Sequence, residues 1–392
     1  MKYYELDRWF EKEIEKLDIS PTNYKKAVDR YNSVASMIEA KLREEYNINS
    51  HVYVQGSFMI GTVIKPYGKD KEYDVDLVCE CDLTKENTSP EELKKIILNI
   101  IKSDGTYGKM LSSEEGRRTW TIEYAEDNQL SFHIDIQPSI PKLDSKFDKA
   151  IFTTTKSKKN PKNYKWDNGN PLGFKDWFDE INKNAYIEIA DIQKRKLIDN
   201  GIYSQVDDIP KQLVVTKLQR LIQVLKRHRD IRFEDSEYKE DKPNSMIITI
   251  LATQVFKDID YRESLPQLVK IFCDKISTNI QLFNKIDGDV TGLLIDRVNG
   301  KYIINNPTVE ENLAERWNDN DNNKMIAFTS WIEWVNKDFS ILFRYENSSE
   351  YENKSFDTFV KECINTKAEK RDSDNSISKE LLNTPKPWKN NV

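Results

Sequence analysis

Residues 54–80 read VQGSFMIGTVIKPYGKDKEYDVDLVCE and join a glycine-serine turn to an acidic strand pattern. In the second half of the stretch, apolar and polar residues alternate, which is typical of a half-buried β-strand. Asp74 and Asp76 therefore share one face of the predicted strand. Two neighbouring carboxylates repel each other and are costly to desolvate, so a fold that keeps them together predicts a divalent cation between them.

The first half of the stretch predicts a phosphate-binding turn. A strand over residues 51–55 leads into Gly56 and Ser57. A residue without Cβ lets the backbone approach a ligand, and a hydroxyl can donate to a phosphate oxygen. Gly61 and Thr62 repeat the small pair. Either feature alone is usually an ordinary turn or a solvated strand face, but the two together are much more specific.

A third acid lies on a second predicted strand. Residues 130–137, LSFHIDIQ, again alternate in polarity and place Asp135 on the polar face. A glycine-serine turn, a carboxylate pair and a third acid from a neighbouring strand resemble the signature of polymerase-β-like nucleotidyltransferases. The resemblance implies that three carboxylates, those of Asp74, Asp76 and Asp135, converge on one catalytic site.

The composition predicts a soluble globular protein that forms two lobes. The chain has 392 residues, of which 38% are hydrophobic and 32% charged, so its apolar content lies outside the disordered range. A net charge of −6 argues against a general nucleic-acid binder. Any polyanion would have to bind at a local positive patch. No apolar run approaches the ~20 residues that span a bilayer, and the amino terminus lacks an apolar signal core. We therefore expect a cytoplasmic protein with no membrane partner and with reduced cysteines.

The order of the elements predicts an α+β fold: a polymerase-β-like sheet lobe and a helical lobe like that of oligoadenylate synthases. Ser20 and Pro21 start a long helix that reaches about residue 46 and serves either as a spine linking the lobes or as a packing helix. A helix over residues 89–102 and a hairpin of residues 118–124 with 130–137 follow. We expect amino-terminal helices in residues 1–48, a nucleotidyltransferase core in 49–172, a helical lobe in 173–368 and a tail in 369–392.

Between residues 138 and 173 the periodicity disappears, and lysines accumulate beside asparagine, proline and glycine. This composition predicts a loop or crossover. A solvated linker is favoured over a basic lip that attracts phosphates. Helical patterns return near residue 175, and residues 286–305 interrupt them with a small β-like or irregular excursion.

A second group of candidate residues lies in the helical lobe. Residues 213–229, LVVTKLQRLIQVLKRHR, predict an amphipathic helix with Lys226 at the edge of its apolar face, Gln223 aligned one turn earlier and Gln219 two turns earlier. Ser245 stands near the start of a later helix. Its hydroxyl and the free backbone amides there can bind phosphate, or Ser245 can be simply an N-cap.

The ordered set GSFMIGT, YDVDLV, HIDIQP, TKLQRLIQVLKRHRD and NPTVEENLAERWNDN resembles the oligoadenylate synthase and cyclic GMP-AMP synthase branch. The resemblance is strongest to its bacterial members, the cyclic-oligonucleotide synthases of anti-phage signalling systems, and covers roughly residues 20–345. It implies contacts from Gln55, Gly56 and Ser57 to the nucleotide. It also implies a triphosphate clamp of Lys226 with Ser245, and Asp74, Asp76 and Asp135 as ligands of two Mg²⁺ ions or of Mn²⁺.

The same resemblance implies NTP substrates, ATP among them, repeated phosphoryl transfer that closes a ring, and activation by a partner protein in some relatives. Two features depart from the wider branch. Met246 stands where some relatives have a base-stacking aromatic residue, and no His/Cys cluster suggests the zinc insertion of DNA-sensing animal relatives. Two rival functions stay open here. One is a linear oligoadenylate synthase activated by double-stranded RNA, although the sequence does not indicate a nucleic-acid activator. The other is a catalytically silent sensor that binds nucleotide or nucleic acid.

Overall fold

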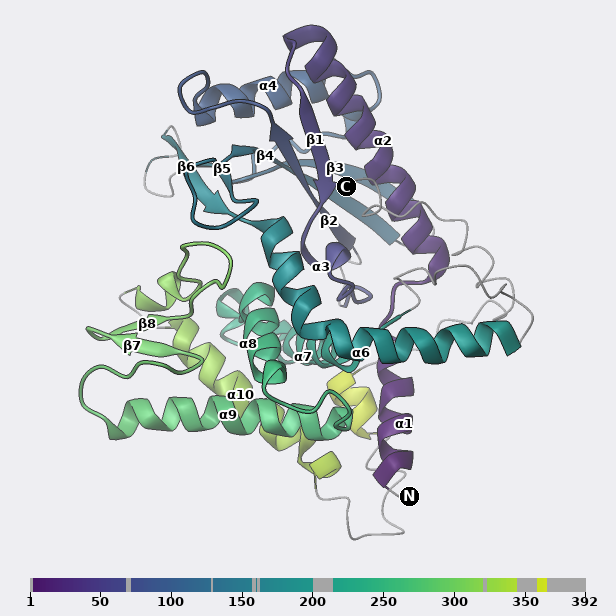
Figure 1. The fold of residues 1–392 in the computed structure, drawn as a ribbon, viewed down its shortest axis with the longest axis vertical. Helices are drawn as coiled ribbons and strands as arrows, with labels where there is room; N and C mark the ends of the chain where they lie inside the picture. The colour runs from purple at the N-terminus through teal and green to yellow at the C-terminus, as the bar shows by residue number, and fades with distance from the viewer. Residues whose placement is uncertain are drawn as a thin grey trace.

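The computed structural model describes residues 3–67, 72–127, 130–156, 160, 163–199, 214–319, 323–343 and 358–364. A mixed sheet with the strand order β1-β2-β4-β5-β6, with β3 also paired to β4, occupies one half of the molecule. A group of helices forms the other half (Figure 1). The predicted α+β class is therefore confirmed.

The central pair of the sheet is parallel, and its other pairs are antiparallel. β2 lies between β1 and β4, and β2 and β4 run in the same direction. The predicted hairpin is confirmed as the antiparallel pair β3–β4. The strands are β1 (Ser50–Val54), β2 (Glu72–Cys81), β3 (Trp120–Asp127), β4 (Leu130–Pro141), β5 (Ile151–Lys156) and β6 (Tyr164–Gly169), with a separate hairpin of β7 (Asp296–Val298) and β8 (Lys301–Ile303).

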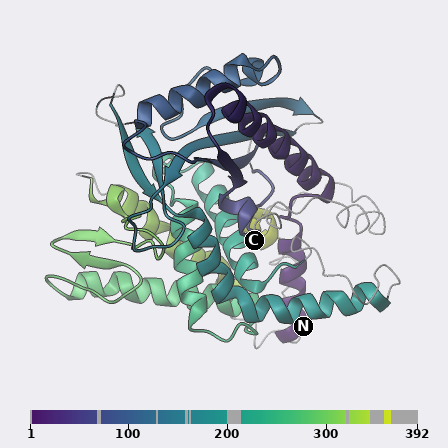
Figure 2. The same cartoon turned by 45° about the horizontal axis from the view of Figure 1, so that its top comes forward.

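Two helices cover one face of the sheet, α2 (Pro21–Tyr46) and α4 (Pro90–Ser103) (Figures 1 and 2). The Ser20 side chain caps α2, as its sequence predicts. Ser89 and Glu92 form a capping box at the start of α4. Alternate residues of β2, Tyr73 among them, are buried under these helices. Asp74 and Asp76 therefore lie on the opposite face of the sheet, since successive side chains in a strand point to opposite sides.

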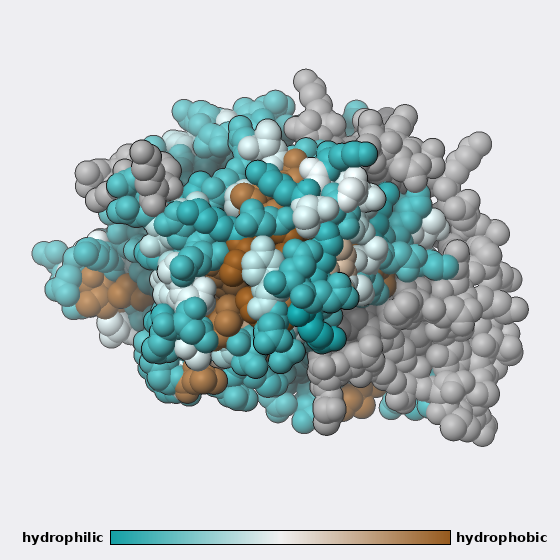
Figure 3. Space-filling view, turned by 90° about the horizontal axis from the view of Figure 1, so that it is seen from above, coloured by the Kyte–Doolittle hydropathy of each residue, from teal (hydrophilic) through white to brown (hydrophobic). Residues whose placement is uncertain are grey.

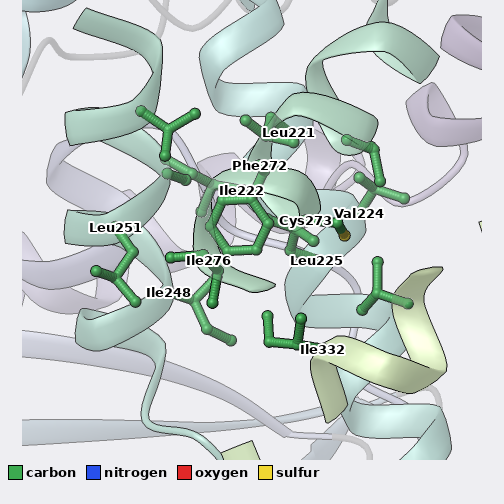
Figure 4. Packing of buried hydrophobic residues seen from close by; sticks show 14 of the residues in the cluster. Leu221, Ile222, Val224, Leu225, Ile248, Leu251, Phe272, Cys273, Ile276 and Ile332 are labelled. Carbon is green, nitrogen blue, oxygen red and sulfur yellow. The ribbon is translucent and has the colours of Figure 1, made fainter. Parts of the chain in front are cut away.

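The second hydrophobic cluster is built by helices. Phe272 of α9 packs among apolar residues of α7 and α8, and Ile332 of α10 closes the group (Figure 4). The long helices are α1 (Tyr3–Glu15), α6 (Pro171–Asp199), α7 (Lys217–Glu234), α8 (Ser245–Lys257), α9 (Leu265–Lys285) and α10 (Asn323–Phe343). Short helical segments are α3 (Gly56–Met59), α5 (Tyr107–Met110), η2 (Lys239–Asp241), η3 (Glu315–Asn318) and η5 (Val360–Ile364).

The amino-terminal helices divide between the two clusters. The buried residues of α1 belong to the helical cluster, whereas those of α2 belong to the sheet cluster. The chain thus crosses from one cluster to the other between α1 and α2. This arrangement links the two halves before the first strand, while α2 itself packs on the sheet.

The prediction of an irregular segment between residues 138 and 173 is wrong in part, because β5 and β6 lie there as an antiparallel pair. The first five residues of β5 are all buried, so the strand shows no alternation of polarity. Lys156 makes an ion pair of 2.5 Å with Glu115, which favours a structural role for it over a phosphate-binding one. Lys158, Lys159, Lys162 and the tail 369–392 lie outside the described residues, and the predicted domain boundaries stay a prediction.

The described residues seen from above are mostly hydrophilic, with hydrophobic residues exposed near the centre of the view (Figure 3). In the described part of the chain, no helix is both long enough and apolar enough to cross a membrane.

The β-like excursion predicted within residues 286–305 is confirmed as the β7–β8 hairpin.

Candidate active site

The three predicted acids lie on one face of the two central strands. In the parallel register of β2 and β4, Asp76 is paired with Asp135 and Asp74 with His133. Paired residues of neighbouring strands point to the same side of a sheet. Thr121 of β3 stands opposite Asp135 and donates a short hydrogen bond to its Oδ1. The structure therefore brings Asp74, Asp76 and Asp135 to the same polar surface.

The glycine-serine turn lies directly beside this surface. The backbone N–H of Gln55 donates to the Asp76 carbonyl at 2.8 Å. This hydrogen bond attaches the end of β1 to the acidic part of β2. Gly56 follows with φ +63°, and a Cβ atom on it would stand 2.7 Å from Oδ2 of Asp76. The position requires glycine for both reasons. The Gln55 side chain points across the same face, 3.5 Å from Gln137 of β4.

Burial and mutual repulsion perturb the acids. Burial raises the pKa of Asp76 to about 7, and the carboxylates of Asp135 and Asp74 add to the effect. The Asp74 side chain is 73% exposed. Its pKa is nevertheless raised, mainly by desolvation from the surrounding protein and secondly by the negative charge of Asp135. Like charges held together in this way are typical of functional sites that bind a cation.

The acids fit a hard cation by their chemistry. Carboxylate oxygens are the donors that Mg²⁺ and Mn²⁺ prefer. As the side chains stand, no three His, Cys, Asp or Glu residues within the described ranges are gathered closely enough to hold a metal ion. Asp135 is turned toward Thr121 and Asp74 toward solvent. Metal binding would therefore require these side chains to rotate toward a shared ion.

Lys226 lies at the seam between α7 and the segment that follows the turn. Its ammonium group donates to Oγ1 of Thr62 at 3.1 Å and lies 3.4 Å from the Thr62 carbonyl. Burial and the positive charge of Arg229 lower the pKa of Lys226 to about 7, while Asp230 and Asp76 act in the opposite direction. Lys226 is thus within electrostatic range of Asp76.

Ser245 lies beside the same part of α7, where Arg229 contacts it. Asn244, not Ser245, is the N-cap of α8, because its side chain accepts a hydrogen bond from the Met246 amide. The Ser245 hydroxyl accepts a hydrogen bond of 2.8 Å from Arg229. The N-cap alternative for Ser245 is therefore wrong.

Sequence reasoning missed several side chains that shape this site. Arg229 is one, and its position three residues after Lys226 was a signal, since residues three apart lie on the same side of a helix. Thr121 is another, and the predicted hairpin would have placed it near Asp135. Gln219 and Gln223 were noted as aligned with Lys226, but their partners, the carbonyls of Ile60 and Val63, were not predicted.

A family model described as the Second Messenger Oligonucleotide or Dinucleotide Synthetase domain matches residues 4–182. This range contains the turn and all three acids. Residues 4–182 are therefore similar to this family. The matched range ends within α6, and most of the helical cluster follows it.

Relatives and solved structures agree with this assignment. The chain is 24% identical over 333 residues to a c-di-GMP synthase of Roseivirga ehrenbergii, covering 85% of this chain and 77% of that protein. Its fold resembles that of CdnG, a CD-NTase of Bradyrhizobium diazoefficiens solved with GTP (TM-score 0.64, 18% identity, 96% and 97% of the two chains).

It also resembles CdnC of E. coli MS115-1 solved with ATP (TM-score 0.59, 11% identity, 90% and 97% of the two chains). CdnC has been solved in a complex with HORMA-deltaN as well. At these identities the structural likeness concerns the fold, and it confirms the predicted nucleotidyltransferase architecture. Together, the family match and the curated relative indicate a nucleotidyltransferase that makes a cyclic nucleotide second messenger.

Proposed function

We propose that this protein joins NTPs by magnesium-dependent phosphoryl transfer into a cyclic di- or oligonucleotide at Asp74, Asp76 and Asp135. One observation carries the site assignment: the glycine of the predicted phosphate turn approaches the Asp76 carboxylate so closely that no Cβ fits between them. A triphosphate held by the turn would therefore lie beside the paired acids. The second messenger would be made for anti-phage signalling.

The turn and α7 supply two walls for the triphosphate. The Ser57 hydroxyl and the backbone amides at Gly56 are donors for phosphate oxygens, with Gln55 next to them. Lys226 approaches from the opposite wall and is already oriented by Thr62. Ser245, held by Arg229, completes that wall in the proposal. A positive charge and fixed hydroxyls would orient the nucleotide for in-line attack.

Asp74, Asp76 and Asp135 would hold Mg²⁺, or Mn²⁺ in its place. Bound there, the cation would supply Lewis-acid stabilisation of negative charge on the transferring phosphoryl group. Two ions are proposed, because three carboxylates exceed the charge that one divalent ion balances. The protein's own contribution is to hold the acids on adjacent strands and to place Asp135 as an acceptor for the proton of an attacking ribose hydroxyl.

The relatives support proposals for the substrates and a partner, and the cysteines support one for the location. Because CdnG was solved with GTP and CdnC with ATP, we propose purine NTPs as substrates, ATP among them. The CdnC complex with HORMA-deltaN supports a regulatory protein partner for this chain. All four cysteines are buried and free, which supports a reducing compartment such as the cytoplasm.

Incubation of the protein with each NTP and Mg²⁺, followed by phosphatase treatment and chromatography, tests the proposal. A phosphatase-resistant cyclic product is expected, and Asp74→Asn with Asp76→Asn should abolish it without unfolding the protein. The exposed Asp274→Asn serves as the matched control and should leave product formation unchanged. Release of a linear product would refute ring closure, and full activity of the double variant would refute the site.

A further inference from the structure

Four side chains of α7 donate hydrogen bonds to backbone carbonyls within residues 60–65, which we call the anchored segment. The amide of Gln219 contacts the Ile60 carbonyl at 2.9 Å, and that of Gln223 contacts the Val63 carbonyl at 3.0 Å. Lys226 lies against Thr62, and Arg227 donates to the Lys65 carbonyl at 2.6 Å. One helix face therefore holds the chain that leaves the phosphate turn.

The side chains that supply these donors are buried. The exposed fractions are 9% for Gln219, 2% for Gln223, 6% for Lys226 and 3% for Arg227. A buried carbonyl that loses its donor has no solvent to replace it, so each contact is expensive to break. The anchored segment consequently has little freedom to move relative to α7.

The anchored segment is in turn bonded to the turn itself. The Thr62 amide donates to the Ser57 carbonyl at 2.9 Å, and the Ile60 amide lies 3.4 Å from the Gly56 carbonyl. Each residue held by Gln219 and Lys226 is thus one hydrogen bond away from Gly56 or Ser57. The position of α7 fixes the position of the phosphate turn.

Gly61 is explained by the same contact. It has φ +67°, and a Cβ atom on it would stand 2.5 Å from Nε2 of Gln219. The small residue lets the Gln219 amide reach the neighbouring Ile60 carbonyl. Gly61, from the second small pair of the sequence, therefore serves attachment of the anchored segment to α7.

We propose that Gln219 is a positioning residue, which sets the distance between the Gly56–Ser57 turn and Lys226 and thereby the affinity for the triphosphate. The inference rests on the proposed function. The two ends of the Gln219 amide do different work. Its Oε1 accepts from the Thr216 amide and completes the capping box of α7, whereas Nε2 holds Ile60. The two roles can therefore be separated.

Gln219→Glu keeps the acceptor of the capping box but loses the donor to Ile60. Thr216→Val is the matched control, because it removes the cap hydroxyl, while the Thr216 backbone N–H still donates to Oε1 of Gln219 and Nε2 still reaches the Ile60 carbonyl. Both proteins are titrated calorimetrically with non-hydrolysable analogues of ATP and GTP in Mg²⁺. We expect Gln219→Glu to lower Tm, because the buried Ile60 carbonyl loses its donor, and to weaken binding about tenfold. Thr216→Val should lower Tm and leave the affinity within about twofold.

Gly61→Ala tests the same contact from the other side and gives an answer even if Gln219→Glu fails to fold. It should also weaken binding about tenfold, whereas Gly292→Ala, with a similar positive φ and open space around it, should not. Wild-type binding that neither Gln219→Glu nor Gly61→Ala changes would overturn the positioning role alone. Failure of the wild type to bind either analogue or to form product would overturn the proposed function, and this inference with it.

Discussion

Gly56 and Asp76 are in such close approach that a single methyl group on Gly56 would stand 2.7 Å from the Asp76 carboxylate oxygen. The two residues are separated by the whole turn between β1 and β2. Their contact is fixed by the hydrogen bond from the Gln55 amide to the Asp76 carbonyl. The phosphate turn and the acidic strand are thus one unit.

Gly56→Ala should reduce product formation at least about 100-fold, because displacing the turn or the carboxylate by even one ångström misaligns the site. Stability should fall by about 1 kcal/mol from the positive φ. Gly300→Ala provides the control, since Gly300 also has a positive φ but has open space where its Cβ would lie. It should share the stability loss, seen in urea unfolding, and keep full product formation. Equal activity of the two variants would contradict the proposed contact.

Asp76 should make stability depend on pH in the absence of divalent cations. Its folded pKa of about 7 lies above the ~3.9 of an unfolded aspartate, so the folded protein binds this proton more tightly. The contribution is fully present below pH ~4 and is lost as the pH rises through about 7.

In EDTA, Asp76→Asn should therefore be more stable than wild type at pH 8, by on the order of 3 kcal/mol, and nearly equal to it at pH 4. Urea unfolding at both pH values measures the difference. Adding Mg²⁺ at pH 8 should stabilise the wild type more than the variant. A difference between the two proteins that does not change with pH would contradict the electrostatic account. The exposed Asp287→Asn should change the free energy of unfolding by under about 0.5 kcal/mol at either pH.

Arg229 should matter more for nucleotide binding than the serine it holds. It donates to Ser245 and to the Pro243 carbonyl, so it fixes the start of α8 beside Lys226. Arg229→Gln is expected to weaken binding of a non-hydrolysable NTP about 10- to 30-fold, and Ser245→Ala about threefold. Fluorescence titration of a labelled nucleotide would check both. A larger effect of Ser245→Ala would reverse the order and make the serine the principal contact.

A polar network centred on the buried His228 ties α7 to α10 and should contribute measurably to the stability of the helical half. His228 is fully buried, with Nε2 at 2.8 Å from Asp338 and Nδ1 accepting from the indole of Trp331. Arg232 pairs with the same carboxylate at 2.6 Å. Asp338→Ala should lower the free energy of unfolding by about 3 kcal/mol, because it leaves the buried His228 without its partner and removes the ion pair of Arg232. Asp274→Ala, which breaks the exposed pair with Lys270, should cost under about 0.5 kcal/mol.

Much of the site was predictable because strand periodicity is a local property. Alternation alone placed Asp74 and Asp76 on one face and Asp135 on the polar face of its strand, and the register of β2 with β4 bears this out. The cap signals at Ser20 and Ser89 also act within a few residues, and both are confirmed. β5 escaped prediction because a strand buried on both faces has no alternation to detect.

The sequence by itself determined the acids, the turn, the elements that carry them and the family resemblance. The tertiary structure decided what each polar side chain touches. Gln219 and Ile60 are 159 positions apart, and their contact depends on how α7 packs against the sheet half of the molecule. Periodicity specifies the face of an element on which a side chain lies, but the packing of distant elements selects its partner. A single hydrogen bond contributes little net free energy, so the hydrophobic burial around it determines which elements come together.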